Sequence, residues 1–144
     1  RWHCAPPAHT CCSCREGRNA TVIDFAIKPN YYPSDNRWRI WGPRNGLLWD
    51  VLAEGNTVTT PRATMSVCEE GTYKLEVWDR DGDGMCCDKG VGSYHLTVDG
   101  VELRFVLRDP TDTYDTLAYL TAFQHNVHEF FVPEKPPPLP PPPP

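Results

Sequence analysis

Residues 93–107 read SYHLTVDGVELRFVL and contain the clearest hairpin pattern of this sequence. Apolar side chains occupy every second position on both sides of the central pair Asp99-Gly100. A period of two is typical of a half-buried β-strand, and Asp-Gly is a preferred pair for a type I′ turn. The stretch therefore predicts two antiparallel strands joined by a tight turn.

The same alternation recurs along the rest of the chain. It predicts strands or apolar stretches at 20–28, 37–41, 47–53, 65–68, 73–78, 117–123 and 127–132. Only the segment 117–123 also fits a short helix. Eight or nine short strands separated by Gly, Pro, Asn and Asp are typical of two packed sheets. We therefore expect an all-β protein, an antiparallel, jelly-roll-like β-sandwich that spans residues 20–132.

Composition excludes several classes of protein. Hydrophobic residues make up 40% of the 144 residues, which is enough for a core and argues against disorder. The net charge of -5 argues against a surface that binds nucleic acid. No apolar run approaches the roughly 18 residues that cross a bilayer, so we expect no membrane association.

The seven cysteines indicate the compartment. They are Cys4, Cys11, Cys12, Cys14, Cys68, Cys86 and Cys87. This density in a short chain is typical of a disulfide framework in a secreted protein, with a cysteine-rich arm over residues 1–19. Six paired cysteines allow fifteen connectivities, and the odd one is free or joins another chain. Zinc held by the arm, with His3 and His9 as further ligands, is the alternative.

One sequence motif agrees with secretion. Asn19-Ala20-Thr21 matches the acceptor pattern for N-linked glycans in proteins that pass through the secretory pathway. We therefore predict a glycan on Asn19 and an extracellular location, at the cell surface or in a matrix.

An acidic, glycine-rich loop follows the strand at 73–78. The candidate ligands for calcium are Asp79, Asp81 and Asp83, with the Met85 carbonyl and Asp88 as further oxygens. Alternate carboxylates on a tight loop can converge on one Ca²⁺, which prefers six to eight oxygens. However, the twelfth position is Gly90 rather than a bidentate glutamate. A strand-connecting turn pinned by Cys86 and Cys87 is therefore the alternative, because Asp and Gly also favour turns.

The same loop carries a family resemblance. The stretch WDRDGDGMCCDKGVGSY at 78–94 resembles the D-x-x-G-D-G-x-C-C-x-x-G-x-G-x-Y core of a module in secreted proteins of algae, diatoms and marine bacteria. The upstream segment 30–38 resembles that module's D-N-Y-P-x-E-x-x-W pattern, with departures at Asn30 and Asn36. The resemblance covers about residues 20–107. It implies a secreted β-sandwich and no particular reaction.

No catalytic pattern stands out. The sequence lacks the nucleophile elbow, the zinc-protease helix motif and the phosphate-binding loop, so we expect no enzyme activity. The five tryptophans could include a platform that stacks on sugars, although aromatics of this size usually pack in cores. Alternation places Trp41 and Trp78 on the faces opposite to the apolar ones.

The C-terminal segment 133–144 forms a separate region. It holds nine of the 16 prolines, and its last nine residues are Pro136, Pro137, Pro138, Leu139, Pro140, Pro141, Pro142, Pro143 and Pro144. Proline fixes φ and donates no backbone hydrogen bond, so this tail should form a polyproline II rod about 28 Å long. Its composition resembles the hydroxyproline-rich rods of algal matrix glycoproteins such as pherophorins.

These features lead to two functional predictions. Because prolines lose little conformational entropy on docking, we expect the tail to bind an aromatic-lined surface, on the same chain or on a neighbouring copy. Head-to-tail docking that does not close builds a filament. We therefore expect a structural subunit of an extracellular glycoprotein filament or matrix, with copies of itself as partners and O-glycosylated hydroxyprolines. The alternative is a carbohydrate- or calcium-dependent adhesion module attached through its proline-rich linker.

Overall fold

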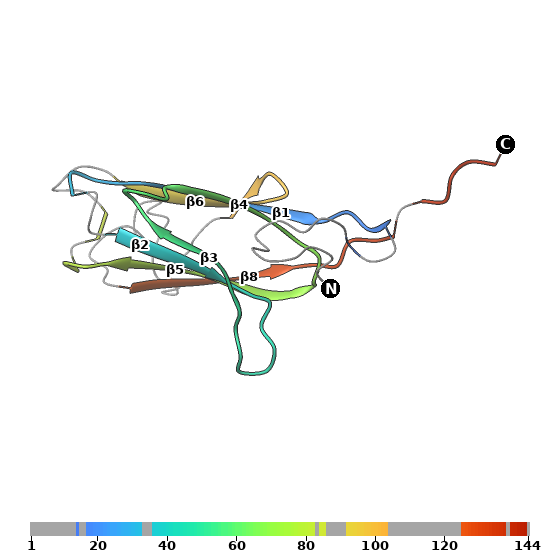
Figure 1. Ribbon diagram of the computed structural model, residues 1–144, viewed down its shortest axis with the longest axis horizontal. Helices are drawn as coiled ribbons and strands as arrows, with labels where there is room; N and C mark the ends of the chain where they lie inside the picture. The colour runs from blue at the N-terminus through green and yellow to red at the C-terminus, as the bar shows by residue number, and fades with distance from the viewer. Residues whose placement is uncertain are drawn as a thin grey trace, which may run out of the picture.

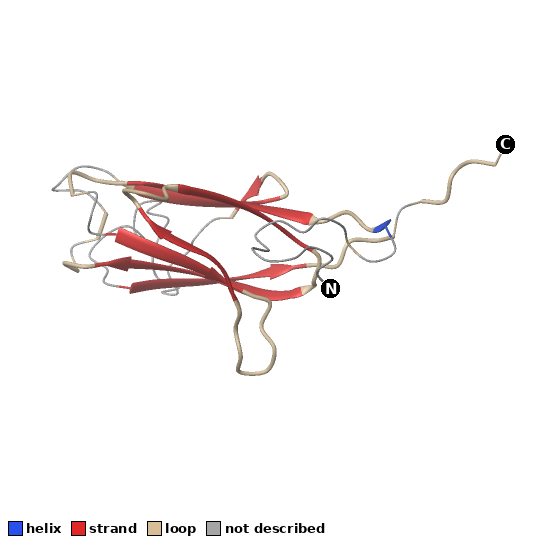
Figure 2. Cartoon of the chain, in the orientation of Figure 1, coloured by secondary structure: helices blue, strands red, loops and turns tan. Residues whose placement is uncertain are grey.

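The computed structural model describes residues 14, 17–32, 36–82, 84–85, 92–103, 125–137 and 139–143. Within this part the chain forms eight β-strands and no α-helix (Figures 1 and 2). The strands are β1 (Thr21–Lys28), β2 (Asn36–Trp41), β3 (Val51–Asn56), β4 (Arg62–Val67), β5 (Gly71–Asp79), β6 (Ser93–Val98), β7 (Val101–Glu102) and β8 (His125–Val132). The prediction of an all-β protein is confirmed.

The strands form two antiparallel sheets of four strands each. One sheet has the order β4-β1-β6-β7 and the other the order β3-β2-β5-β8. Figure 1 shows the two sheets as separate layers with their strands running along the long axis of the body. The jelly-roll connectivity stays a prediction, because residues 104–124 between β7 and β8 lie outside the described part.

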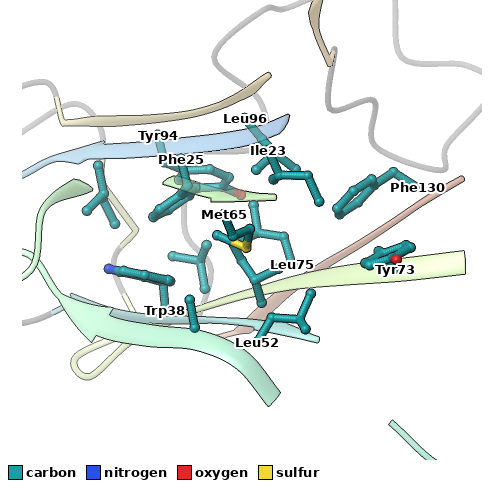
Figure 3. Close-up of a cluster of buried hydrophobic side chains, with 14 of the residues drawn as sticks. Ile23, Phe25, Trp38, Leu52, Met65, Tyr73, Leu75, Tyr94, Leu96 and Phe130 are labelled. Carbon is teal, nitrogen blue, oxygen red and sulfur yellow. The ribbon is translucent and has the colours of Figure 1, made fainter. Parts of the chain in front are cut away.

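The core lies between the two sheets. In β1 the side chains of Ile23, Phe25 and Ile27 are buried and the residues between them are more exposed, as the alternation predicts. Phe25 of one sheet meets Trp38 of the other with ring centroids 4.7 Å apart (Figure 3). The core contains aromatic side chains from both layers, and their burial drives the packing of one sheet on the other.

The turn between β6 and β7 has the predicted form. Asp99 and Gly100 have φ angles of 50° and 80°, and a type I′ turn requires positive φ at both central residues. The Asp99 carboxylate also accepts a hydrogen bond from the Val22 amide at 2.9 Å. The hairpin is therefore attached to the start of β1, while the predicted continuation to residue 107 lies outside the described residues.

The apolar run 47–53 is only partly a strand. β3 begins at Val51, and Leu47 and Leu48 are 90% and 72% exposed. The amides and carbonyls of Asn45 and Leu48 bond each other at 2.9 Å, which closes a tight turn at this place. Turn formation thus removes the two leucines from the sheet, which hydrophobicity alone did not indicate.

Candidate functional site

The outer face of the β3-β2-β5-β8 sheet carries a group of aromatic and cationic side chains that contact one another. Because β2 and β5 alternate, Trp38 and Ile40 point into the core while their neighbours point outward. We call this surface the cation–aromatic face. Its members are Arg37, Arg39, Trp41, Trp49, Lys74, Glu76, Trp78 and His125. The predicted outward position of Trp41 and Trp78 is therefore found in the structure.

Cations and indole rings alternate across this face. The Arg39 guanidinium lies 5.0 Å from the centroid of the Trp41 ring and 5.8 Å from that of Trp78. The Lys74 ammonium lies 5.1 Å from the Trp41 ring and 4.5 Å from the Trp49 ring. Each such contact contributes about 0.5–1 kcal/mol at an exposed site. The tryptophans are thus engaged within the protein itself.

The ring of Trp78 has partners from both neighbouring strands. Arg37 of β2 lies across from it, with its guanidinium 4.8 Å from the ring centroid. His125 of β8 lies across on the other side, stacked at 5.1 Å with an interplanar angle of 7°. A sugar that stacks on this indole would have to displace one of these partners.

A buried carboxylate neutralises part of this charge. Glu76 is 8% exposed, and its oxygens lie 3.3 Å from the Lys74 ammonium and 2.5 Å from His125 Nε2. Arg39 pairs with Glu54 of the edge strand at 2.7 Å. The cation–aromatic face is therefore a mixed surface of both charges and does not present a field of one sign.

A second feature holds the start of the proline tail against the body. The Lys135 ammonium donates to the Ala20 carbonyl at 2.8 Å and pairs with the Asp99 carboxylate at 2.9 Å. Arg18 pairs with Glu134 and donates to the Lys135 carbonyl at 3.2 Å. We call this set of contacts the tail clamp. It joins the chain that leaves β8 to the opposite sheet, at the start of β1 and the β6–β7 turn.

Asp99 is the central acceptor of the tail clamp. Burial raises the pKa of its carboxyl, but the hydrogen bond from the Val22 amide and the bond and charge of Lys135 outweigh burial, so the pKa is lowered. The carboxylate therefore stays ionised at neutral pH and keeps both partners.

Beyond the tail clamp the tail leaves the body. Described residues 136–137 and 139–143 are exposed, with Leu139 at 92%, and Figure 1 shows this segment projecting from one end of the molecule. Of the proline positions predicted to act in assembly, Pro138 and Pro144 lie outside the described residues. The others are presented to solvent.

The described residues of the acidic loop act as a turn. Both oxygens of the buried Asp79 carboxylate accept hydrogen bonds, one from the Gly84 amide at 2.9 Å and one from the Asn36 side chain at 3.2 Å. Asp81 faces Arg80 at 3.7 Å, with more than half of its side chain exposed. The Met85 carbonyl accepts from the Gly92 amide at 2.7 Å.

The structure thus describes only three of the five predicted calcium ligands, Asp79, Asp81 and Met85. Asp83 and Asp88 lie outside the described residues. Among the described residues no group of three His, Cys, Asp or Glu side chains is arranged to hold a metal ion. The calcium site stays a prediction.

One pair of cysteines lies at disulfide distance. Cys14 and Cys68 have sulfur atoms 2.08 Å apart and Cα atoms 5.4 Å apart, and 54 residues separate them along the chain. The remaining five, Cys4, Cys11, Cys12, Cys86 and Cys87, lie outside the described residues. Asn19, the predicted glycan acceptor, is exposed and adjoins the tail clamp.

An interior polar group was not identified from the sequence. Tyr94 Oη lies 2.6 Å from His128 Nε2 and accepts a hydrogen bond from the side-chain amide of Asn126 at 3.0 Å. Burial lowers the pKa of His128 to about 4, so the imidazole that bonds Tyr94 is neutral at neutral pH. Alternation along β8 predicts that His128 points inward. It does not predict that Tyr94 of the other sheet is its partner. This bond connects the two sheets.

Comparison of the chain with models of protein families, with curated proteins and with solved structures gave no match. In the part of the chain that the structure describes, no helix is both long enough and apolar enough to span a membrane.

Proposed function

We propose that this protein is a structural subunit of an extracellular glycoprotein filament or matrix. It assembles head to tail, with the proline tail of one copy bound to the body of the next. In this proposal the body is a disulfide-stabilised sandwich, Asn19 carries a glycan, and the tail is a polyproline II rod with modified prolines.

The tail clamp is the observation that supports this proposal. Two charged side chains, Glu134 and Lys135, bind the body immediately before the proline run begins. They determine where the tail leaves the body, and the described residues after them are exposed. A flexible linker needs no such attachment, whereas a rod that must reach a partner in a defined direction does.

The chemistry of the tail favours a protein partner. A run of prolines has fixed φ, so little conformational entropy is lost when it binds. Its carbonyl groups have no amide partners within the run and accept hydrogen bonds from a receptor. Because the tail and its receptor are different surfaces, the contact is heterologous and can repeat indefinitely.

Removal of the tail tests this proposal. The full chain, secreted from a eukaryotic host, is compared with a chain that ends at Lys135, which leaves the tail clamp intact. A matched control replaces residues 136–144 with a Gly/Ser segment of equal length, which keeps the reach but removes the stiffness. Light scattering after size exclusion gives the mass over a range of concentrations.

We expect the full chain to form oligomers that grow with concentration, and both variants to stay monomeric with unchanged thermal unfolding. Assembly of the chain that ends at Lys135 to the same extent as the full chain would falsify the proposal. A full chain that is monomeric at its highest soluble concentration contradicts it equally.

The alternative function is a carbohydrate- or calcium-dependent binding module. The observation in its favour is that Trp41, Trp49 and Trp78 share one outer face. A glycan array probed with and without calcium tests it, with Trp41→Ala as the variant. Binding that this substitution abolishes supports the alternative, and an empty array in both conditions removes it.

A further inference from the structure

The end of the body opposite to the tail clamp carries two exposed tyrosines. Tyr31 is 77% exposed and Tyr32 is 47% exposed, and they follow β1 after Pro29 and Asn30. We call residues 30–32 the tyrosine turn.

The tyrosine turn and the tail clamp lie at opposite ends of β1. The strand starts beside Ala20, which the tail clamp binds, and its last residue Lys28 pairs with Ser93 at the start of β6. Its eight residues cover about 26 Å at about 3.3 Å per residue. Figure 1 shows the connection from β1 to β2 at one end of the body and the C-terminus at the other.

The backbone of the tyrosine turn is supported from below. The Asn30 side chain accepts a hydrogen bond from the Tyr32 amide at 2.9 Å, which is the geometry of an Asx turn. Gly92 packs against the backbone of residues 28–30. A Cβ atom at this position would lie only 2.8 Å from the Asn30 nitrogen and from the Lys28 carbonyl oxygen, so the close approach requires glycine. The Gly92 amide in turn bonds the Met85 carbonyl at 2.7 Å. Gly92 and the Met85 carbonyl thus support the backbone before the tyrosines.

Tyr31 differs from the tryptophans in what covers its ring. Trp41 and Trp78 have cations or an imidazole on their faces, whereas most of the Tyr31 surface is open to solvent. Tyrosine combines a ring that packs on pyrrolidine with a hydroxyl that donates to a carbonyl. These are the two contacts that a polyproline segment offers, because its carbonyls have no internal donors.

We propose that the tyrosine turn is the receptor for the proline tail of the next copy. This inference rests on the proposed head-to-tail assembly and identifies the surface that receives the tail. The tail residues 136–144 carry no charged side chain, so they gain nothing from the mixed charges of the cation–aromatic face and need ring and hydroxyl contacts, which the exposed Tyr31 offers. A rod of nine residues is about 28 Å long, so it reaches well past the tail clamp into a neighbouring body.

Complementation between two defective chains tests the inference. The first chain carries Tyr31→Ala and Tyr32→Ala and keeps its tail, and the second ends at Lys135 and keeps its tyrosines. The matched control carries Leu47→Ala and Leu48→Ala, which removes another exposed apolar pair. Analytical ultracentrifugation gives the mass of each chain alone and of the two defective chains mixed.

We expect each defective chain to be monomeric and their equimolar mixture to form a one-to-one dimer, because one tail and one receptor remain. The double tyrosine variant should bind the tail at least about tenfold more weakly than the natural chain. Tyr31→Phe with Tyr32→Phe, which keeps the rings and removes the hydroxyls, should weaken binding about fivefold. The leucine control should assemble like the natural chain.

The outcomes separate the two proposals. If the chain that ends at Lys135 is monomeric while the double tyrosine variant still assembles, tail docking stands and this receptor is wrong. If the mixture of defective chains forms no dimer, the receptor assignment is also wrong. If the chain that ends at Lys135 assembles normally, the proposed function itself is wrong and this inference with it.

Discussion

The inner and outer faces of the β3-β2-β5-β8 sheet use the same residue types in different ways. Strand β2 has Trp38 inside and Trp41 outside, and strand β8 has His128 inside and His125 outside. Of the inner residues, Trp38 is buried and His128 is partly buried, and both bond specific groups of the other layer or of a neighbouring loop. The outer residues stack against cations or an indole at the surface. The face of the sheet, and not the residue type, therefore determines what each side chain contributes.

The largest expected difference is between the two tryptophans of β2. Trp38→Ala should lower the free energy of unfolding by about 3–5 kcal/mol, because it removes a buried ring and leaves a cavity. The Thr60 carbonyl also loses the indole N–H that donates to it at 2.9 Å. Urea unfolding followed by circular dichroism measures the change.

Trp41→Ala is the matched control for this prediction. Its ring makes two cation contacts that together contribute about 1–2 kcal/mol at a partly exposed site. Equal losses in the two variants would show that the outer face is as important for stability as the core, contrary to the comparison.

The inner histidine of β8, His128, should make the stability of the fold depend on pH. Burial lowers the pKa of His128 from the ordinary 6.5 to about 4. Between these pH values the unfolded chain binds a proton that the folded protein does not bind, so the free energy of unfolding falls as pH falls. The loss amounts to at most about 3 kcal/mol and levels off below about pH 4.

Unfolding midpoints measured from pH 7 to pH 4 test this prediction. His128→Gln should reduce the slope in this range. A slope that persists unchanged in His128→Gln would contradict the assignment.

The smallest expected effect concerns the carboxylate of the outer face. Glu76→Gln keeps the shape of the side chain but removes the charge that faces Lys74 and His125. We expect a loss of about 0.5–1 kcal/mol, because the neutral amide still accepts a hydrogen bond from Lys74 and because His125 is 42% exposed and screened by solvent. The loss should shrink in high salt, and a larger loss that is insensitive to salt would mean that Glu76 acts as a core residue.

The local features of the fold could be predicted from the sequence. The alternation of β1, the Asp99-Gly100 turn and the outward position of Trp41 and Trp78 all depend on residues that are neighbours along the chain. The run at 47–53 was misleading because the turn between Asn45 and Leu48 overrides hydrophobicity. Propensity is a weak guide where backbone hydrogen bonds close a loop.

The candidate sites depend on contacts that no local pattern contains. Arg18 and Glu134 are 116 residues apart, and the Cys14–Cys68 pairing is one of many that seven cysteines allow. The sequence pattern singled out the tyrosines at 31–32 only as part of the segment that resembles a known module. Their exposure, and their place at the end opposite to the tail, follow from how the sheets are ordered.

The sequence by itself determined which residues face the same side of each strand, because side chains alternate with a period of two on any extended backbone. It also determined that the last nine residues form a tail of nearly continuous proline. Only the tertiary structure decided that this tail begins at a clamp on one end of the body, with two exposed tyrosines at the other. Strand order and sheet packing bring distant residues together through the burial of a shared core, and no periodicity along the chain encodes which strand becomes the neighbour of which.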